Sequence, residues 1–311
     1  MNISNEDFLM DIPSFDTLKE KIVSYRKQCE IIDRWLVKRL DTVLPMIMQR
    51  SGIDTWVICN NEHNEDPVFR TLSPALMMSA RRLTILVMHL KEDGSVERFS
   101  FTHPVPDIAH LYTPCWLNPK DAVWGNDKYF LENKKGVKVS EVPETQWECL
   151  GRVIHELHPK KIGLDYSEHD AYADGLSHSL YLKVMDALHE EERDKVVSAE
   201  PLCIGWLETR IDEEMNAYNG IVQMAHALIK DPLGFDGHAA GPTIGLWDHQ
   251  DGVEHEGDYI IHDATCYSLE LNATVEFFGK KQIFSMESDI MLRDGKKYFL
   301  AGRQTNFHLV K

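Results

Sequence analysis

The spacing of hydrophobic residues changes along the chain, and this change limits the folds that it can adopt. Up to about residue 200, segments with an apolar residue at every third or fourth position alternate with short apolar runs. Such a pattern predicts helices that alternate with strands in an α/β domain. In residues 267–277 the period becomes two, which predicts a strand with one buried face. We therefore expect an α/β domain over residues 1–200 and a second, largely β domain over residues 201–311.

Local signals set the expected elements of the first domain. A stripe of apolar residues at three- and four-residue spacing predicts one helix, and shorter segments predict a second helix and three strands. The helices are expected at residues 15–50 and 144–157, and the strands at 53–60, 82–90 and 160–167. Gly52 ends the first helix, and Asp93-Gly94 indicates a hairpin after the second strand.

The second domain is expected to begin with a linker and a long helix within residues 199–230. Thr209 is a suitable N-cap for this helix, and Pro232 with Gly234 stops it. Strands at 267–277 and 281–292 follow, with a hairpin signal at Asp294-Gly295.

Composition excludes several classes of function. The formal net charge is −17, and Lys and Arg are scattered among acidic residues, which disfavours a nucleic-acid-binding surface. No apolar run approaches the ~20 residues of a membrane span, and the N-terminus has no signal-peptide pattern. The six cysteines are spread singly without a CxxC motif, as expected for reduced, buried thiols. We expect a cytoplasmic protein without a nucleic-acid or membrane partner.

Three residues of the second domain are candidate metal ligands. His238 lies in the glycine-rich stretch "LGFDGHAAGPTIGLWDHQ", Glu270 is on the polar face of a predicted strand, and Glu287 is on the next strand. One imidazole and two carboxylates can hold a catalytic zinc or manganese ion, with a position left for the water that attacks the substrate. Taken singly, each residue has a simpler role: a glutamate on a polar face is commonly solvated, and a histidine beside glycines commonly hydrogen-bonds the loop.

Three motifs in order resemble the creatinase/aminopeptidase P/methionine aminopeptidase superfamily. They are "GHAAGPTIGLWD", "YSLELNATVE" and "FSMESDIMLRDG". These pita-bread metallopeptidases of the M24 type include bacterial Xaa-Pro aminopeptidase-like proteins, to which the likeness is closest. The segment "RWLVKRLDTVLPMIMQRSGIDTWVICNNEHNEDPVF" resembles the family's creatinase-type N-terminal α/β domain, and "LETRIDEEMNAYNGIVQMAHALI" resembles the helix that opens its catalytic domain. The resemblance implies a pita-bread α+β domain over residues 201–311.

The resemblance also assigns roles to single residues. The family's metal-binding histidine lies in a Gly-His-x-x-Gly loop, which matches His238; the two family glutamates correspond to Glu270 and Glu287. A second register would place Pro242 at the ligand position, and proline cannot coordinate a metal. His249 matches a downstream histidine that contacts the substrate, although its spacing from His238 is longer than usual in the family.

The pattern departs from the family at one point. The resemblance implies two metal-binding aspartates on strands between the opening helix and the histidine loop, but the predicted helix leaves no room for these strands. Aspartates near His238 have an ordinary role in turns and caps. The C-terminal domain is therefore predicted to be a truncated pita-bread domain.

Two classes of function follow, and whether the chain is an enzyme stays open at this point. The first is a metallopeptidase homologue with an impaired or absent dinuclear site, which uses Mn, Zn or Co if active and acts on peptides with proline at the second position. The second is a non-catalytic binding or oligomerisation protein, or a deletion product of a longer peptidase. Because truncation exposes strand edges and apolar faces, we expect a homodimer.

Overall fold

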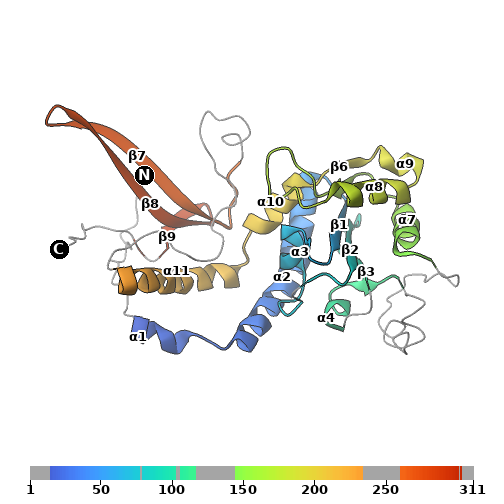
Figure 1. Cartoon of the computed structure of the whole chain (residues 1–311), viewed down its shortest axis with the longest axis horizontal. Coiled ribbons are helices and arrows are strands. Elements are labelled where there is room, and N and C mark those ends of the chain that lie inside the picture. Colours follow the sequence, from blue (N-terminus) through green and yellow to red (C-terminus); the bar gives the residue numbers. More distant parts are fainter. Residues whose placement is uncertain are drawn as a thin grey trace. The chain divides into compact units, whose positions relative to one another are not determined.

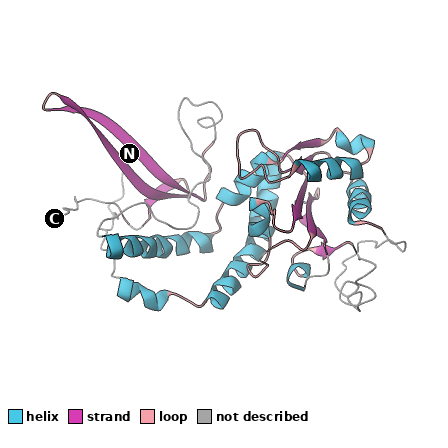
Figure 2. Ribbon diagram, in the orientation of Figure 1, coloured by secondary structure: helices cyan, strands magenta, loops and turns pink. Residues whose placement is uncertain are grey.

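The structure is a computed structural model that describes residues 15–77, 79–102, 106–116, 144–233, 260–300 and 302. The chain divides into two compact units. Unit 1 comprises Met1–Lys27 and Glu208–Lys311, and unit 2 comprises Gln28–Leu207. Figure 2 shows that unit 2 combines helices with a sheet, whereas the strands of unit 1 form a long ribbon.

Unit 2 contains a six-stranded mixed sheet in the order β4-β3-β2-β1-β5-β6 (Figure 1). Strands β1, β2 and β3 are antiparallel neighbours, whereas β1, β5 and β6 are parallel, as are β3 and β4. The strands are β1 (Thr55–Asn61), β2 (Leu83–Leu90), β3 (Val96–Phe101), β4 (Thr113–Pro114), β5 (Ile162–Leu164) and β6 (Val196–Ser198). This part of the chain is therefore an α/β structure, as predicted, and its sheet is mixed.

Helices cover both faces of this sheet, since successive residues of the central strand β1 are buried on opposite sides (Figure 1). One face carries Val57 and Cys59 and packs against α7 (Gln146–Leu157) and α8 (His178–Ala187). Helices α2 (Tyr25–Ser51) and α3 (Pro67–Leu72) lie on the other side. The short helices are α4 (Pro106–Ala109), α9 (Glu190–Arg193) and α10 (Glu200–Glu208).

Unit 1 joins a long helix to an antiparallel ribbon. Its elements are α1 (Phe15–Leu18), the 3₁₀ turn η1 (Lys19–Lys21), α11 (Asp212–Leu233), β7 (Thr265–Phe277), β8 (Lys280–Arg293) and β9 (Lys296–Phe299). A small core forms where Tyr218 and Val222 of α11 meet Cys266 of β7 and Leu300. Arg293 of β8 adds an ion pair to Asp212 at 2.9 Å. These contacts fix one end of the ribbon on α11.

Most predicted elements are confirmed, and three predictions are wrong. The helix expected over residues 15–50 is interrupted, because Ile22 adopts an extended conformation between η1 and α2. The expected linker after residue 199 is helix α10, whose apolar side chains are buried. Thr209 does not cap α11; the helix begins at Asp212, and Glu214 accepts a hydrogen bond from the backbone nitrogen of Ile211 at 2.9 Å.

The cysteine prediction is confirmed, since all six thiols are buried and none forms a disulfide. Burial raises the pKa of Cys266 to about 11, so this thiol stays protonated and unreactive at neutral pH. Among the helices of the described ranges, none combines the length and the apolar character that crossing a bilayer requires.

Candidate functional site

The β7–β8 ribbon determines where the two candidate glutamates lie. Phe278 and Gly279 form its tip, and both have positive φ angles, 49° and 70°. A two-residue connection with positive φ at both positions matches the right-handed twist of paired strands and sets their register. From this tip, the register pairs thirteen residues of β7 with β8 (Figure 1), beginning with Phe277 opposite Lys280.

This register makes Glu270 and Glu287 direct cross-strand partners. Residues directly opposite each other in an antiparallel pair occupy the same face of the ribbon. The two residues that the motifs single out are thus neighbours in the ribbon. His238 and His249 lie outside the described residues, so their positions relative to the glutamates stay predictions.

The same face of the ribbon carries a second polar pair. Ser268 and Asp289 are cross-strand partners two residues from Glu270 and Glu287, and side chains two residues apart on a strand point the same way. The Ser268 hydroxyl is buried and has no hydrogen-bond partner within the described part of the chain. We did not single out Asp289 from the sequence; its spacing of two from Glu287 is the signal that could have identified it.

The end of α11 limits the residues that can complete the site. The helix extends to Leu233, so only residues 234–237 separate it from His238. Four residues are too few for two paired strands of ordinary length. The stretch between this helix and His238 is therefore too short for the two strands that the sequence resemblance implies.

A second set of titratable groups lies in unit 2 at the carboxyl ends of β1 and β5. Asp165 directly follows β5, and Asp66 precedes α3. The Trp56 indole donates to Asp165 Oδ1 at 2.5 Å, and Asp66 Oδ1 accepts from the backbone nitrogen of Val68 at 2.7 Å. In α/β sheets, the carboxyl ends of parallel strands are the usual place for ligands.

Burial excludes these acids from direct contact with a substrate, since each is only 1% exposed. Gly175 closes over Asp66: a Cβ atom at this glycine would lie 1.9 Å from Asp66 Oδ2. Burial raises the pKa of Asp66 to about 6. Burial and the charge of Asp66 raise the pKa of Asp165 well above its ordinary value. We interpret the pair as a buried, proton-sharing structural contact.

Comparison with known proteins identifies no close relative. No family model matches the chain, and no curated protein matches it. The chain is similar to the crystal structure of an X-Pro aminopeptidase from Thermotoga maritima MSB8, with 11% identity, a TM-score of 0.40, and coverage of 82% of this chain and 97% of that one.

Two further structures show similarity of the same kind. For an Xaa-Pro dipeptidase from Bacillus anthracis, the identity is 12% and the TM-score 0.34, with 85% of this chain and 66% of that chain covered. For a recombinant prolidase from Thermococcus sibiricus, the identity is 11% and the TM-score 0.36, with 91% and 98% covered.

Proposed function

We propose that the chain is a homologue of the pita-bread Xaa-Pro aminopeptidases that binds a single divalent metal ion and has lost the dinuclear centre. The observation that carries the proposal is the register between β7 and β8. It makes Glu270 and Glu287, the two glutamates of the family-like motifs, cross-strand partners. A one-residue slip would have moved one of them to the opposite face of the ribbon.

The donor set fits a divalent metal ion. Two carboxylates at adjacent positions, with one imidazole from His238, provide the oxygen and nitrogen ligands that Zn, Mn or Co accept. When bound, such an ion acts as a Lewis acid toward a carbonyl group or a water molecule. The protein's part is to hold the two carboxylates in register, and His249 is the proposed residue for substrate contact.

Only one metal ion is proposed because the chain lacks the segment for a second. With four residues between α11 and His238, the two bridging aspartates that the resemblance implies have no place. We therefore expect no efficient release of the N-terminal residue from peptides with proline at the second position.

The test measures bound metal and peptidase activity together. Three full-length proteins are compared: wild type, Glu270→Gln and the matched control Glu276→Gln. Each is stripped with a chelator, equilibrated with Mn²⁺, Zn²⁺ or Co²⁺, and analysed for metal content. Glu276 is an exposed glutamate further along β7. We expect Glu270→Gln to bind one metal ion fewer than Glu276→Gln; metal bound elsewhere cancels in this difference. Equal metal content in the two variants would refute the site.

An Xaa-Pro peptide assay on the same samples tests the lost dinuclear centre. We expect no turnover above the background of the metal-free chain. Turnover that Glu270→Gln abolishes and Glu276→Gln retains would show that the catalytic centre is intact, and would overturn this part of the proposal.

The outer end of the ribbon favours a second candidate function, oligomerisation. Val275 is 47% exposed, Ile283 63% and Phe278 90%. In this register, Val275 and Ile283 occupy opposite faces of the ribbon. In the described structure, β9 pairs only with the stretch of β8 from Ile290 to Arg293, which leaves most of the β8 edge without a strand partner. An open edge with apolar neighbours promotes pairing with another chain.

A second copy of this chain is the proposed occupant of that edge, which would make the protein a homodimer. Sedimentation of wild type and of Ile283→Lys tests this function. We expect a concentration-dependent dimer in wild type that Ile283→Lys weakens. A wild-type chain that stays monomeric at all concentrations would exclude this candidate.

A further inference from the structure

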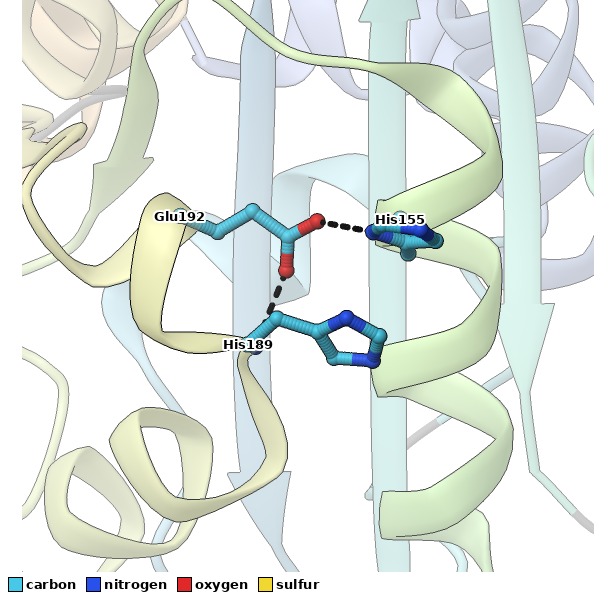
Figure 3. Close-up of side chains that lie close together, drawn as sticks. All are labelled: His155, His189 and Glu192. Atoms are coloured by element: carbon cyan, nitrogen blue, oxygen red, sulfur yellow. Dashed lines mark hydrogen bonds and ion pairs between the residues drawn. The ribbon is translucent and has the colours of Figure 1, made fainter.

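Unit 2 contains a group of metal-ligating side chains that none of the motifs includes. Within the part of the chain that the structure describes, one set of three His, Cys, Asp or Glu residues brings its ligand atoms together: His155, His189 and Glu192 (Figure 3). His155 is in the last turn of α7, His189 directly precedes α9, and Glu192 lies within α9. The site joins two segments that are more than thirty residues apart in sequence.

The ligand atoms are already close together. One ring nitrogen from each histidine and one oxygen of Glu192 all lie within 4.8 Å of one another. His155 Nδ1 is 2.9 Å from Glu192 Oε1, and the two imidazole rings stack with their centroids 4.2 Å apart. Tetrahedral zinc with bonds of ~2.0–2.1 Å separates its ligand atoms by about 3.3 Å, so the ligand atoms must approach by at most about 1.5 Å and the stacked rings must rotate until both ring nitrogens point at the ion.

Local structure holds the carboxylate in place and leaves the histidines accessible. Glu192 is 2% exposed, and its Oε2 accepts a hydrogen bond from the backbone nitrogen of His189 at 3.0 Å. This backbone contact orients Oε1 toward His155. His155 is only partly buried and His189 is exposed, so an ion from solution can reach both rings.

The charges around the three residues favour a cation. Glu191 Oε1 lies 3.6 Å from His155 Nδ1 and adds a second carboxylate beside the rings. The neighbouring arginines are directed to other partners: Arg193 Nε donates to the Leu188 carbonyl at 3.1 Å, and Arg152 pairs with Glu144 at 2.6 Å. The Glu192 carboxylate itself contacts His155 and the backbone nitrogen of His189.

We propose that His155, His189 and Glu192 form a surface site for one divalent transition-metal ion, with zinc as the best match to two imidazoles and a carboxylate. The ion takes the place of the hydrogen bond between His155 and Glu192, and water or Glu191 completes the tetrahedron. Bound zinc links α7 to α9. Because α7 and the neighbouring α8 cover the same face of the sheet, the link stabilises the helical layer of unit 2. This site is independent of the ribbon glutamates.

The test uses the full chain with Glu270→Gln and Glu287→Gln, so that zinc at the ribbon does not contribute. Chelator-stripped protein is titrated with ZnCl₂ by calorimetry, and its thermal unfolding midpoint is measured with and without zinc. We expect one equivalent of zinc to bind and to raise the midpoint, because an ion that binds the folded state alone stabilises it.

Single variants in this background assign the site. We expect His189→Ala and His155→Gln each to raise the zinc dissociation constant by at least about tenfold and to remove the zinc-dependent shift in the midpoint. His178→Ala, an exposed histidine at the start of α8, is the matched control and should leave both unchanged. His189→Ala decides the result if His155→Gln fails to fold, since the His189 side chain is exposed. No zinc binding in the background, or equal affinity in His189→Ala and His178→Ala, would overturn the proposal.

Discussion

Replacing Asp165 with asparagine is expected to stabilise the chain by an amount that increases with pH. Asp165 and Asp66 are buried together, and Asp165 Oδ2 has no hydrogen-bond partner among the described residues. A proton on Asp165, shared with Asp66, satisfies this atom. Burial and the negative charge of Asp66 raise the pKa of Asp165 well above its ordinary value. In the pH range between its unfolded and folded pKa values, Asp165 therefore takes up a proton on folding.

The magnitude follows from the linkage between protonation and stability. For Asp66, the pKa rises from 3.8 to about 6, which corresponds to about 3 kcal/mol. Both carboxyls have folded-state pKa values above the unfolded ones. Their stabilising contribution is therefore fully present below the unfolded pKa and is lost as pH rises toward the folded pKa. Over the pH range in which Asp165 is protonated in the folded state and ionised in the unfolded state, each pH unit lowers the free energy of unfolding by about 1.4 kcal/mol.

Asparagine removes the Asp165 part of this cost. Its amide oxygen can still accept from the Trp56 indole, and its NH₂ group can donate to Asp66 in place of the proton. We expect the difference in unfolding free energy between Asp165→Asn and wild type to grow by about 1.4 kcal/mol per pH unit while wild-type Asp165 keeps its proton.

Urea unfolding followed by tryptophan fluorescence between about pH 5 and pH 8 measures this difference. The buried Trp56 and Trp206 report on unit 2. Asp186→Asn on the exposed side of α8 is the control and should show no such trend. A difference for Asp165→Asn that is constant with pH would refute the shared proton.

Three further variants test local features of the fold by the same urea assay. Thr145→Ala should lower the unfolding free energy by ~1 kcal/mol, because Thr145 Oγ1 accepts from the backbone nitrogen of Glu148 in a capping box; an unchanged midpoint would contradict this role. Trp206→Ala should cost ~3–5 kcal/mol, because the ring is fully buried and its Nε1 donates to Thr71 at 2.8 Å; a loss below ~1 kcal/mol would mean that the site collapses around the cavity. Phe278→Asn should stabilise the ribbon, because asparagine tolerates the positive φ of 49° better than phenylalanine and no burial is lost; a lower midpoint than wild type would show that the exposed ring makes a stabilising contact.

Predictions from the sequence are correct where short-range chemistry decides the conformation. Gly52 ends a helix, and Gly94 and Asp294-Gly295 lie in hairpin connections, each with at least one positive φ angle. The predicted strands at 53–60 and 82–90 became β1 and β2 within two residues of the expected ends. Glycine and aspartate act in these turns through their own backbone preferences, so distant residues are not needed to predict them.

Other elements could not be predicted from periodicity. Helix α10 has buried apolar residues on several sides, Leu202, Cys203 and Trp206 among them, so its sequence shows no polar stripe from which periodicity could predict a helix. The helix expected over residues 15–50 is interrupted between η1 and α2, and the boundary between the two units follows after Lys27. Hydrophobic periodicity gives no information about which of the two cores a segment joins.

For the candidate sites too, the sequence predicted some features and the tertiary structure decided others. The sequence by itself determined the types of ligand residue, the motif order that resembles a metallopeptidase family, and the lack of room for the aspartate strands. Only the tertiary structure decided that Glu270 pairs with Glu287 across the ribbon, because the register depends on a turn at Phe278-Gly279 that local signals did not identify. Only the packing of α9 beside α7 brings His155 to His189 and Glu192. Residues far apart in sequence become neighbours through burial of shared apolar surface, which is a property of the whole unit.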